Sequence, residues 1–289
     1  MSDAVWVALR SHDDQPLVAE TLAALARQTV PHRLMAFDNA STDGTREAVA
    51  AAAERVVDVP AGAYVPGRVL NDAMRLTDGA VVAFVNADCT PAHDDWLQRL
   101  LAGLDDPQVG AVFGRQVPRP GAHPLHARDT ELAYGDGARQ ASWRHCFSMA
   151  ASAIRRADWE VAPFDEGLRY SEDIDWTWRL RQRGRGVRYV PDAVAVHSHD
   201  YTLRQLARRH YGEGCAEASI FEWSAWQASL VRYSVLPWGR QVLGDVRWAL
   251  GQGLWGLAAE VPVIRAVQAA GRRAGFVAGR DALRTRGTR

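Results

Sequence analysis

Short apolar runs of strand length alternate with segments of helical period through the first part of the chain. The apolar runs are Ala4–Leu9, Arg33–Phe37, Ala80–Val85 and Val109–Phe113. Between the first two runs, Leu17, Leu22 and Leu25 recur on one helical face. Strand–helix–strand order of this kind predicts a mostly parallel, mixed sheet with helices on both faces, which is an α/β fold.

The composition narrows the class of protein. Hydrophobic residues make up 47% of the chain, so a packed core is expected and wholesale disorder is not. The 34 basic residues balance 34 acidic ones, which argues against a nucleic-acid partner. Three cysteines without a CxxC pair support neither a disulfide framework nor a zinc ribbon. Without a signal region or an apolar run of about 18 residues, we expect a cytoplasmic location. The alternative is peripheral contact with the inner face of the membrane.

The second half of the chain predicts a domain boundary near residue 215. Residues 114–144 are rich in Pro, Gly, Arg and His and predict a long functional loop with a short helix at Leu125–Tyr134. Two strand signals, "VRYVP" and "AVAVHSHD", precede a helix, "TLRQLARRHYGEG", which Gly212 or Gly214 is expected to close. We therefore predict an α/β domain over 1–215 and a C-terminal helical region over 216–289.

Polar side chains follow the predicted strands at the edge where open α/β sheets bind ligands. The second strand ends at Asp38 and Asn39, the third is followed by Asn86 and Asp88, and the first runs into "RSHDD". Asp and Asn also favour turns because they hydrogen-bond nearby backbone, so each residue alone has a structural explanation. Three such sites on one edge favour a crevice for a nucleotide and a metal ion.

A second acidic cluster stands in "YSEDIDWTWRL", where Glu172, Asp173 and Asp175 lie beside Trp176 and Trp178. Acids in a first helical turn gain about 0.3–1 kcal/mol from the helix dipole, which is the structural interpretation. The same placement points a carboxylate out of the helix start toward whatever lies in front, where it could act as a base. The tryptophans are either a platform facing a ligand, for which Trp176 is the candidate, or core; Trp178 is expected to pack inward.

Together these stretches resemble family 2 glycosyltransferases of GT-A fold, in particular bacterial rhamnosyltransferase-like members. The family's opening is similar to "LRSHDDQPLVAETLAALARQTVPHRLMAFDNASTDGT". Its Asp-x-Asp element resembles "AFVNADCTPAHDDWLQRLL", and its Glu-Asp segment and downstream His resemble "YSEDIDWTWRL" and "AVHSHD". The resemblance covers Val5–Gly214 and implies a Rossmann-like catalytic domain, followed here by a C-terminal helical extension, in an enzyme of polysaccharide biosynthesis.

Carried over position by position, the resemblance implies a nucleotide site. Asp38 would accept from the imide N–H of a uracil or thymine base, with Ser11 and His12 lining the same pocket. Asn86 stands at the first position of the Asp-x-Asp element, where it keeps an acceptor for a ribose hydroxyl but lacks the charge of Asp, so metal affinity is expected to be lower. The segment that closes over the nucleotide in the family corresponds to Arg68 and Asn71.

The resemblance also implies a metal site and a catalytic base. Asp88 matches the last Asp of Asp-x-Asp, a ligand of Mn²⁺ or Mg²⁺. His197 matches the downstream His ligand, with His199 as the other possibility. Asp173 matches the base that deprotonates the acceptor, and Glu172 would help to position that acceptor.

These residues predict an inverting glycosyltransferase that moves a sugar from a UDP- or dTDP-linked donor, with dTDP-rhamnose as the candidate, to a saccharide, lipid-linked or small-molecule acceptor. The departing nucleoside diphosphate carries negative charge that a hard divalent cation neutralises. A sugar-nucleotide pyrophosphorylase is one alternative, but it would need a Gly-rich phosphate loop, and "LRSHDDQP" has no glycine. A non-catalytic nucleotide-sugar binder is the other, and it would not require Asp173.

The C-terminal region carries five tryptophans and an Arg-rich end. The tryptophans are Trp223, Trp226, Trp238, Trp248 and Trp255. Helices of this composition either pack on the α/β domain or on a second subunit, as in a homodimer, or rest on a membrane surface. Gly and Pro interruptions argue against one long amphipathic helix.

Overall fold

A computed structural model describes residues 5–137 and 146–287, which form two compact units. The first unit runs to Ser198, except for residues 123–128 and 169–171, which belong with the second unit from His199 onward. The boundary expected near residue 215 falls inside a continuous helix, α8 (Leu203–Ile220), so the structure divides the chain before that helix instead. No described helix is both long and apolar enough to cross a membrane.

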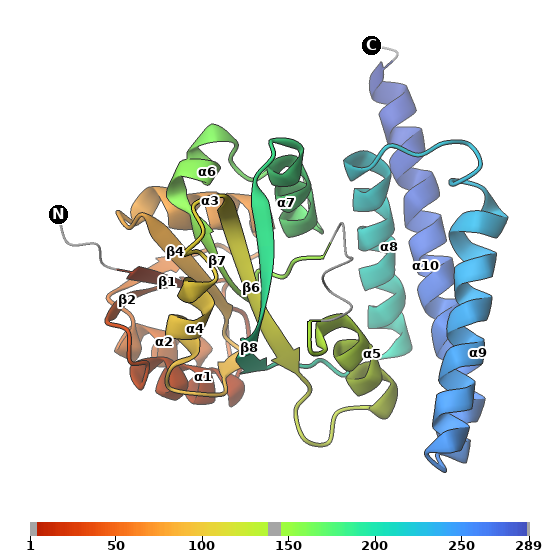
Figure 1. Cartoon of the computed structure of the whole chain (residues 1–289), viewed down its shortest axis with the longest axis horizontal. Helices are drawn as coiled ribbons and strands as arrows, with labels where there is room; N and C mark the ends of the chain where they lie inside the picture. Colours follow the sequence, from red (N-terminus) through yellow and green to blue (C-terminus); the bar gives the residue numbers. More distant parts are fainter. Residues whose placement is uncertain (1–4, 138–145, 288–289) are drawn as a thin grey trace. The chain divides into compact units, whose positions relative to one another are not determined.

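A mixed sheet lies at the centre of the first unit, with the strand order β3-β2-β1-β4-β7-β6-β8-β5 (Figure 1). The strands are β1 (Val5–Ser11), β2 (His32–Asp38), β3 (Arg55–Asp58), β4 (Val81–Asn86), β5 (Thr90–Pro91), β6 (Val109–Val117), β7 (Ala151–Arg155) and β8 (Gly186–Val196). The pairs β1–β2, β1–β4, β2–β3 and β6–β8 are parallel, and the three pairs made by β5 and β7 are antiparallel. The predicted mixed, mostly parallel sheet is confirmed.

The central strand β7 has no counterpart in the sequence prediction. It lies antiparallel between β4 and β6, and Ile154 is opposite both Val82 and Ala111. Four of its five residues are buried, so it lacks the alternation by which a half-exposed strand is recognised. The two predicted strands "VRYVP" and "AVAVHSHD" are one strand, β8, which ends at Val196.

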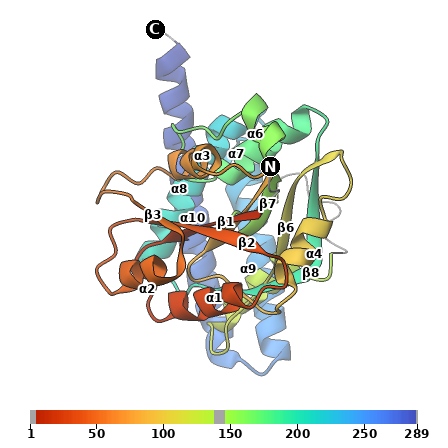
Figure 2. The same cartoon turned by 90° about the vertical axis from the view of Figure 1, so that its left-hand side faces the viewer.

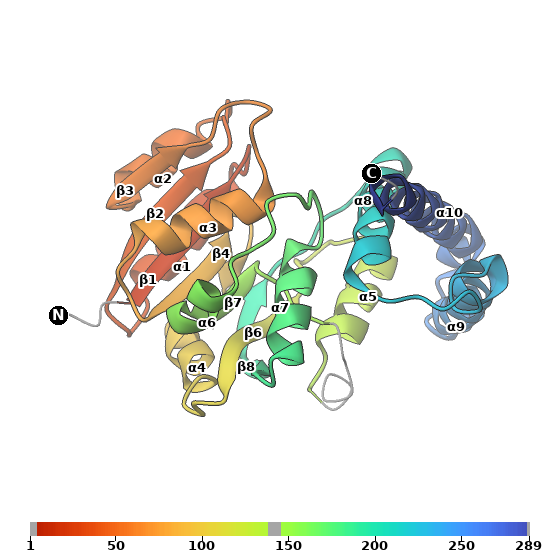
Figure 3. The same ribbon diagram turned by 90° about the horizontal axis from the view of Figure 1, so that it is seen from above.

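Helices cover both faces of this sheet, and Figure 2 shows the sheet between the two helical layers. One face is covered by α1 (Leu17–Ala26), α2 (Thr45–Ala52) and α4 (Trp96–Ala102). The other is covered by α3 (Pro66–Leu76), α6 (Arg156–Val161) and α7 (Glu172–Gln182), which Figure 3 shows in front of the strands. Each layer buries its own hydrophobic cluster against the sheet, as expected of a helix with one apolar stripe.

The second unit is helical. Besides α8 it contains a π-helical turn (Val231–Val235), α9 (Leu236–Gly251) and α10 (Trp255–Gly287). The helix α5 (Pro124–Tyr134), of which only the part up to Arg128 belongs to this unit, confirms the predicted Leu125–Tyr134. The tail is divided into α9 and α10 between Gly251 and Trp255, in keeping with the expectation that it is not one long helix, although α10 itself continues through Pro262.

Gly214 does not close a helix as the sequence suggested, because α8 continues to Ile220. A Cβ at Gly214 would collide with the carbonyl group of Arg272, and one at Gly275 with that of Tyr211. These glycines therefore allow the backbones of α8 and α10 to pack closely, as small residues do at tight helix crossings.

Candidate active site

The carboxyl ends of β2, β1 and β4 are adjacent and in register. Ser11 is opposite Asp38, and Arg10 is opposite Asn86. Asp88 follows in the turn after β4. The structure therefore brings together the polar residues that the sequence assigned to one edge of the sheet.

Asp38 is held by hydrogen bonds on both carboxylate oxygens. Its Oδ1 accepts from the hydroxyls of Ser11 at 2.9 Å and Ser41 at 2.6 Å, and its Oδ2 accepts from the backbone N–H of Ser41 at 2.9 Å. The residue is 1% exposed. A carboxylate has about four acceptor sites, so about one remains on Oδ2 for a further donor.

The loops after β1 and β2 are joined to each other by side-chain bonds. His12 Nδ1 lies 2.7 Å from the carbonyl oxygen of Asn39. Asp13 has a left-handed backbone, with φ 51°, and its carboxylate accepts from the backbone N–H of Thr42 at 2.7 Å. A non-glycine residue in this region carries strain that the surrounding bonds must sustain, so the two loops form one fixed wall.

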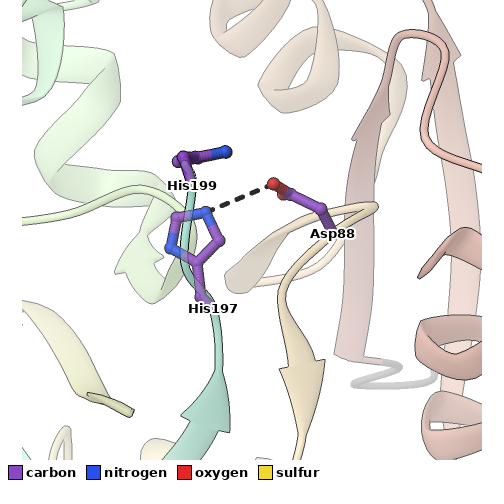
Figure 4. Close-up of side chains that lie close together, drawn as sticks. All are labelled: Asp88, His197 and His199. Carbon is purple, nitrogen blue, oxygen red and sulfur yellow. Dashed lines mark ion pairs between the residues drawn. The ribbon is translucent and has the colours of Figure 1, made fainter. Parts of the chain in front are cut away.

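Asp88 and His197 are brought together by the pairing of two strands. β5 runs antiparallel to β8, with Thr90 opposite Val196, and this places the next residue, His197, beside Asp88. His197 Nε2 is 3.5 Å from Asp88 Oδ2. Figure 4 shows the Asp88 carboxylate and the His197 ring turned toward each other, with His199 two residues further along the same segment.

Gln116 fixes the tautomer of His197. Nδ1 of His197 is 2.7 Å from Oε1 of Gln116, and an amide oxygen only accepts, so Nδ1 carries the proton. The Gln116 amide is itself oriented by its donation to Ser148 Oγ at 2.8 Å. In the neutral ring, Nε2 then carries the lone pair on the side of Asp88. A carboxylate and a neutral imidazole nitrogen facing each other are a donor set that fits a divalent cation.

Asp173 lies in the first turn of α7 and has a perturbed acidity. Burial, with the neighbouring charge of Glu172 as the second cause, raises the pKa of Asp173 to about 7. The backbone N–H groups of Ile174 at 2.8 Å and Met149 at 3.4 Å act in the opposite direction, as does Arg10. A carboxyl group tuned to the middle of the pH range is suited to accept a proton in catalysis.

Arg10 connects the sheet edge with α7. Its guanidinium donates to Asn86 Oδ1 at 2.8 Å and lies 3.5 Å from Glu172 Oε1. Arg10 and Glu172 are both nearly buried. Glu172 is therefore neutralised by Arg10, while its neighbour Asp173 is the carboxylate that burial favours in the protonated form.

Asn71, which the resemblance assigns to the segment that closes over the nucleotide, is a buried residue of α3. Its amide N–H groups donate to the carbonyl oxygen of Phe164 and to Glu166, both at 3.0 Å. Its Oδ1 accepts from Trp159 Nε1 and from the backbone N–H of Phe164, both at 2.9 Å. These four bonds exhaust the amide, so Asn71 ties α3 to α6 and to the segment before α7 and has no group left for a nucleotide.

Of the two tryptophans of α7, Trp176 is the more buried one. Trp176 is fully buried, donates from Nε1 to the carbonyl oxygen of Ala162 at 2.8 Å and stacks on Phe164 at 5.1 Å between ring centroids. It is a core residue and not an acceptor platform, whereas Trp178 is half-buried. Arg68 is an exposed residue whose Nε donates to Glu166 at 3.2 Å.

Three polar residues at this edge have no role in the sequence prediction, namely Arg10, Gln116 and Arg119. Arg119 donates to the carbonyl oxygen of Asp88 at 3.0 Å and so holds the turn that carries it. Asp14 is a fourth, because burial, with the charge of Asp88 contributing, raises its pKa to about 6. The acidic stretch "RSHDD" was the one sequence signal for Asp14. The contacts of Arg10, Gln116 and Arg119 join residues far apart in the sequence, so no local pattern indicates them.

Comparison with known proteins decides the family. Residues 7–161, more than half of the chain, match the model described as "Glycosyl transferase family 2". The chain belongs to this family. The prediction of a nucleotide-sugar-dependent glycosyltransferase is thereby confirmed, as is the resemblance to rhamnosyltransferase-like members in the sequences below.

Two relatives place the chain within the family. The O-antigen chain rhamnosyltransferase WbaN of Salmonella anatum is 28% identical over 211 residues, which cover 69% of this chain and 67% of that protein. The pre-mycofactocin glycosyltransferase of Mycobacterium tuberculosis is 33% identical over 144 residues, which cover 47% of this chain and 30% of that protein.

Two solved structures have a similar fold. The mannosyltransferase PcManGT from Pyrobaculum calidifontis, in complex with GDP-Man and Mn²⁺, has a TM-score of 0.65 at 21% identity and is matched over 95% of this chain and 86% of that one. Glucosyl-3-phosphoglycerate synthase from Mycobacterium tuberculosis, in complex with Mn²⁺, UDP and phosphoglyceric acid, has a TM-score of 0.56 at 18% identity over 77% and 80% of the two chains. They confirm the GT-A α/β fold.

Proposed function

We propose that the chain transfers a sugar with inversion from a nucleoside-diphosphate sugar to an acceptor hydroxyl, with Asp173 as the general base. The observation that carries this proposal is the Asp173 carboxyl in the first turn of α7, whose pKa is raised to about 7 beside Glu172. Asp173 takes the proton of the acceptor hydroxyl while that oxygen forms a bond to the anomeric carbon and the nucleoside diphosphate leaves from the opposite face. A base placed in this way contributes about 10²–10⁴-fold to the rate.

The nucleotide is proposed to bind at the ends of β1 and β2. The remaining acceptor site of Asp38 would take an N–H of the base, and Ser11 and His12 would line the same pocket. Ser11 supports this role by fixing the Asp38 carboxylate. Asn86 would offer its amide to the ribose while Arg10 holds its oxygen. Arg68 stays part of the proposal as an exposed cation at the start of α3.

The metal is proposed to bind between Asp88 and His197, with His199 as a further ligand. A bound divalent cation supplies charge neutralisation for the departing diphosphate. A set that includes imidazole suits Mn²⁺ better than Mg²⁺, which prefers oxygen ligands. Gln116 and Ser148 keep Nε2 of His197 turned toward Asp88.

The donor and acceptor are proposed from the relatives. WbaN is named as an O-antigen chain rhamnosyltransferase, so dTDP-rhamnose is the first donor to test and a saccharide or lipid-linked saccharide the first acceptor class. UDP- and GDP-linked sugars complete the donor panel.

Release of free nucleoside diphosphate, measured with each donor and an acceptor library, tests the proposal. We expect acceptor-dependent release that requires Mn²⁺ and is lost on substitution of Asp173 by Asn. Tight donor binding without any release across the panel would support a non-catalytic binder, and formation of a nucleotide sugar from a nucleoside triphosphate and a sugar phosphate would support a pyrophosphorylase.

A further inference from the structure

The outward face of α9 combines leucine and arginine in a regular pattern. Leu236, Leu243 and Leu250 follow one another at intervals of seven residues, and Arg240 and Arg247 stand between them. Positions spaced by three or four residues share one side of a helix, so the five side chains form a single stripe, called here the Leu–Arg face. All five are exposed.

The opposite side of α9 is buried and explains how the helix is held. Ala249 packs in the hydrophobic cluster of the second unit. Asp245, which is 4% exposed, accepts from Arg265 Nε and Arg128 Nε, both at 2.8 Å. Helix packing therefore uses one side of α9 and leaves the Leu–Arg face without a partner in the described part of the chain.

The exposed charged residues of α9 have one sign, and the nearest exposed acids along the chain, Glu222 and Glu260, stand outside it. Between Trp223 and Ala259 the sequence holds three arginines and a single acid, Asp245. Asp245 is neutralised inside the unit, whereas Arg232, Arg240 and Arg247 make no ion pair with a described carboxylate. The exposed surface of this stretch is therefore only positively charged.

The same stretch exposes large apolar side chains. It contains eight of the sixteen exposed large hydrophobic residues of the described chain, so the exposure is concentrated here. Trp226 is 66% exposed before α9, Leu243 62% in its middle and Trp255 72% after it. Tryptophan and leucine beside arginine, with no exposed acid, is the composition of helices that lie in a lipid headgroup layer.

We propose that the Leu–Arg face binds an anionic phospholipid surface, with α9 lying along it. A second copy of the chain is a poorer occupant, because a two-fold contact through this face would set the arginines of one copy against those of the other with no carboxylate to pair them. An anionic headgroup layer complements the arginines, and the acyl boundary takes the leucines and tryptophans.

Flotation of the full chain with vesicles, in the absence of donor, tests the proposal independently of transfer. We expect binding to phosphatidylcholine vesicles that contain phosphatidylglycerol, and at least tenfold weaker binding to phosphatidylcholine alone. Each arginine near an anionic surface is worth about fivefold, so the double variant Arg240→Gln/Arg247→Gln should bind about 30-fold more weakly. Leu243→Glu should abolish binding.

Two matched controls lie elsewhere on the surface. Val161→Glu adds the same charge at an exposed valine of α6, and Arg204→Gln/Arg208→Gln removes two exposed arginines from α8. Both should bind vesicles as the parent does. The proposal is overturned if the parent does not float, if the controls lose as much binding as the α9 variants, or if light scattering finds a dimer that Leu243→Glu dissociates.

Discussion

Asp38 and Asp173 are both carboxyl groups at the proposed site, but Asp38 is buried, Asp173 is partly buried, and their surroundings differ. Asp38 accepts three hydrogen bonds, two of them from serine hydroxyls. Among the described residues, Asp173 accepts from two backbone N–H groups and lies next to Glu172, and its pKa is raised to about 7. The first environment fixes the direction of the carboxylate oxygens, and the second favours proton exchange.

This difference separates binding from chemistry within one site. A carboxylate that must recognise an N–H group needs its oxygens held in a fixed direction, and the three hydrogen bonds to Asp38 provide this. A carboxylate that must accept a proton at neutral pH works best when burial brings its pKa near the working pH. The comparison therefore predicts that the same Asp→Asn change has different consequences at the two positions.

The largest expected effect is on transfer by Asp173→Asn. The change is nearly isosteric but removes the proton acceptor, so the turnover number should fall by about 10²–10⁴-fold while donor affinity, measured by calorimetry, stays within about twofold of the parent. Near-parental turnover at matched donor affinity would remove Asp173 from the mechanism.

The matched control for that variant is Asp175→Asn, in the same helical turn. Asp175 accepts from Arg179 Nε at 2.9 Å, so its loss should affect stability and leave turnover within a few-fold. Glu172→Gln should give an intermediate loss because it unpairs Arg10. A larger loss at Asp175 than at Asp173 would move the base to Asp175.

The next effect concerns the metal site. Gln116→Leu removes the acceptor that fixes the His197 tautomer and should weaken Mn²⁺ binding about 10–100-fold, the usual cost of losing a hydrogen-bond partner behind a metal ligand. Asp88→Ala should abolish it. Electron paramagnetic resonance of free Mn²⁺ measures both without turnover.

The conservative variant Gln116→Glu is the control, since it keeps an acceptor for Nδ1 and should retain more affinity than Gln116→Leu. Equal losses in both Gln116 variants would show that the side chain acts through packing alone.

The smallest of the three effects is on nucleotide affinity. Asp38→Asn turns part of the acceptor facing the base into a donor and should weaken UDP or dTDP binding about tenfold, the value of one hydrogen bond to a charged group. Ser41→Ala, which removes one hydroxyl donor to Asp38, should weaken it less. Unchanged affinity of Asp38→Asn for UDP, dTDP and GDP would place the base elsewhere.

The sequence predicted the parts of the site that depend on local pattern. Asp38 follows its apolar run directly and Asp88 comes three residues after its own, so the edge they share follows from strand order alone. The contact between Asp88 and His197 depends on β5, a strand of two residues that no periodicity reveals. Gln116 stands in the predicted loop and acquires its role from β6 extending to Val117.

Some of the differences between the sequence prediction and the structure could have been foreseen from the sequence, and others could not. Trp176 and Leu180 are spaced by four residues and are both buried, so the helical period already indicated which tryptophan faces inward. Asn is usually exposed, but Asn71 is buried on α3, and its amide makes all of its hydrogen bonds within the protein. The local sequence pattern predicts a helix end at Gly214. It cannot show that Gly214 packs α8 against α10, because α10 lies far along the chain.

The pH dependence of kcat/KM tests the role of Asp173 most directly. A base with its pKa raised to about 7 is protonated below that value, so kcat/KM should fall about tenfold per pH unit below pH 7 and level off above it. Asp14, whose pKa is raised to about 6, is the alternative source of such an acidic limb in the pH profile. If Asp173 is the source, the Asp14→Asn variant should show the same fall in kcat/KM at low pH as the parent. The account predicts that the limb is present in the parent and absent from the residual activity of Asp173→Asn. A flat profile in the parent from pH 5 to 8, or the same limb in Asp173→Asn, would contradict it.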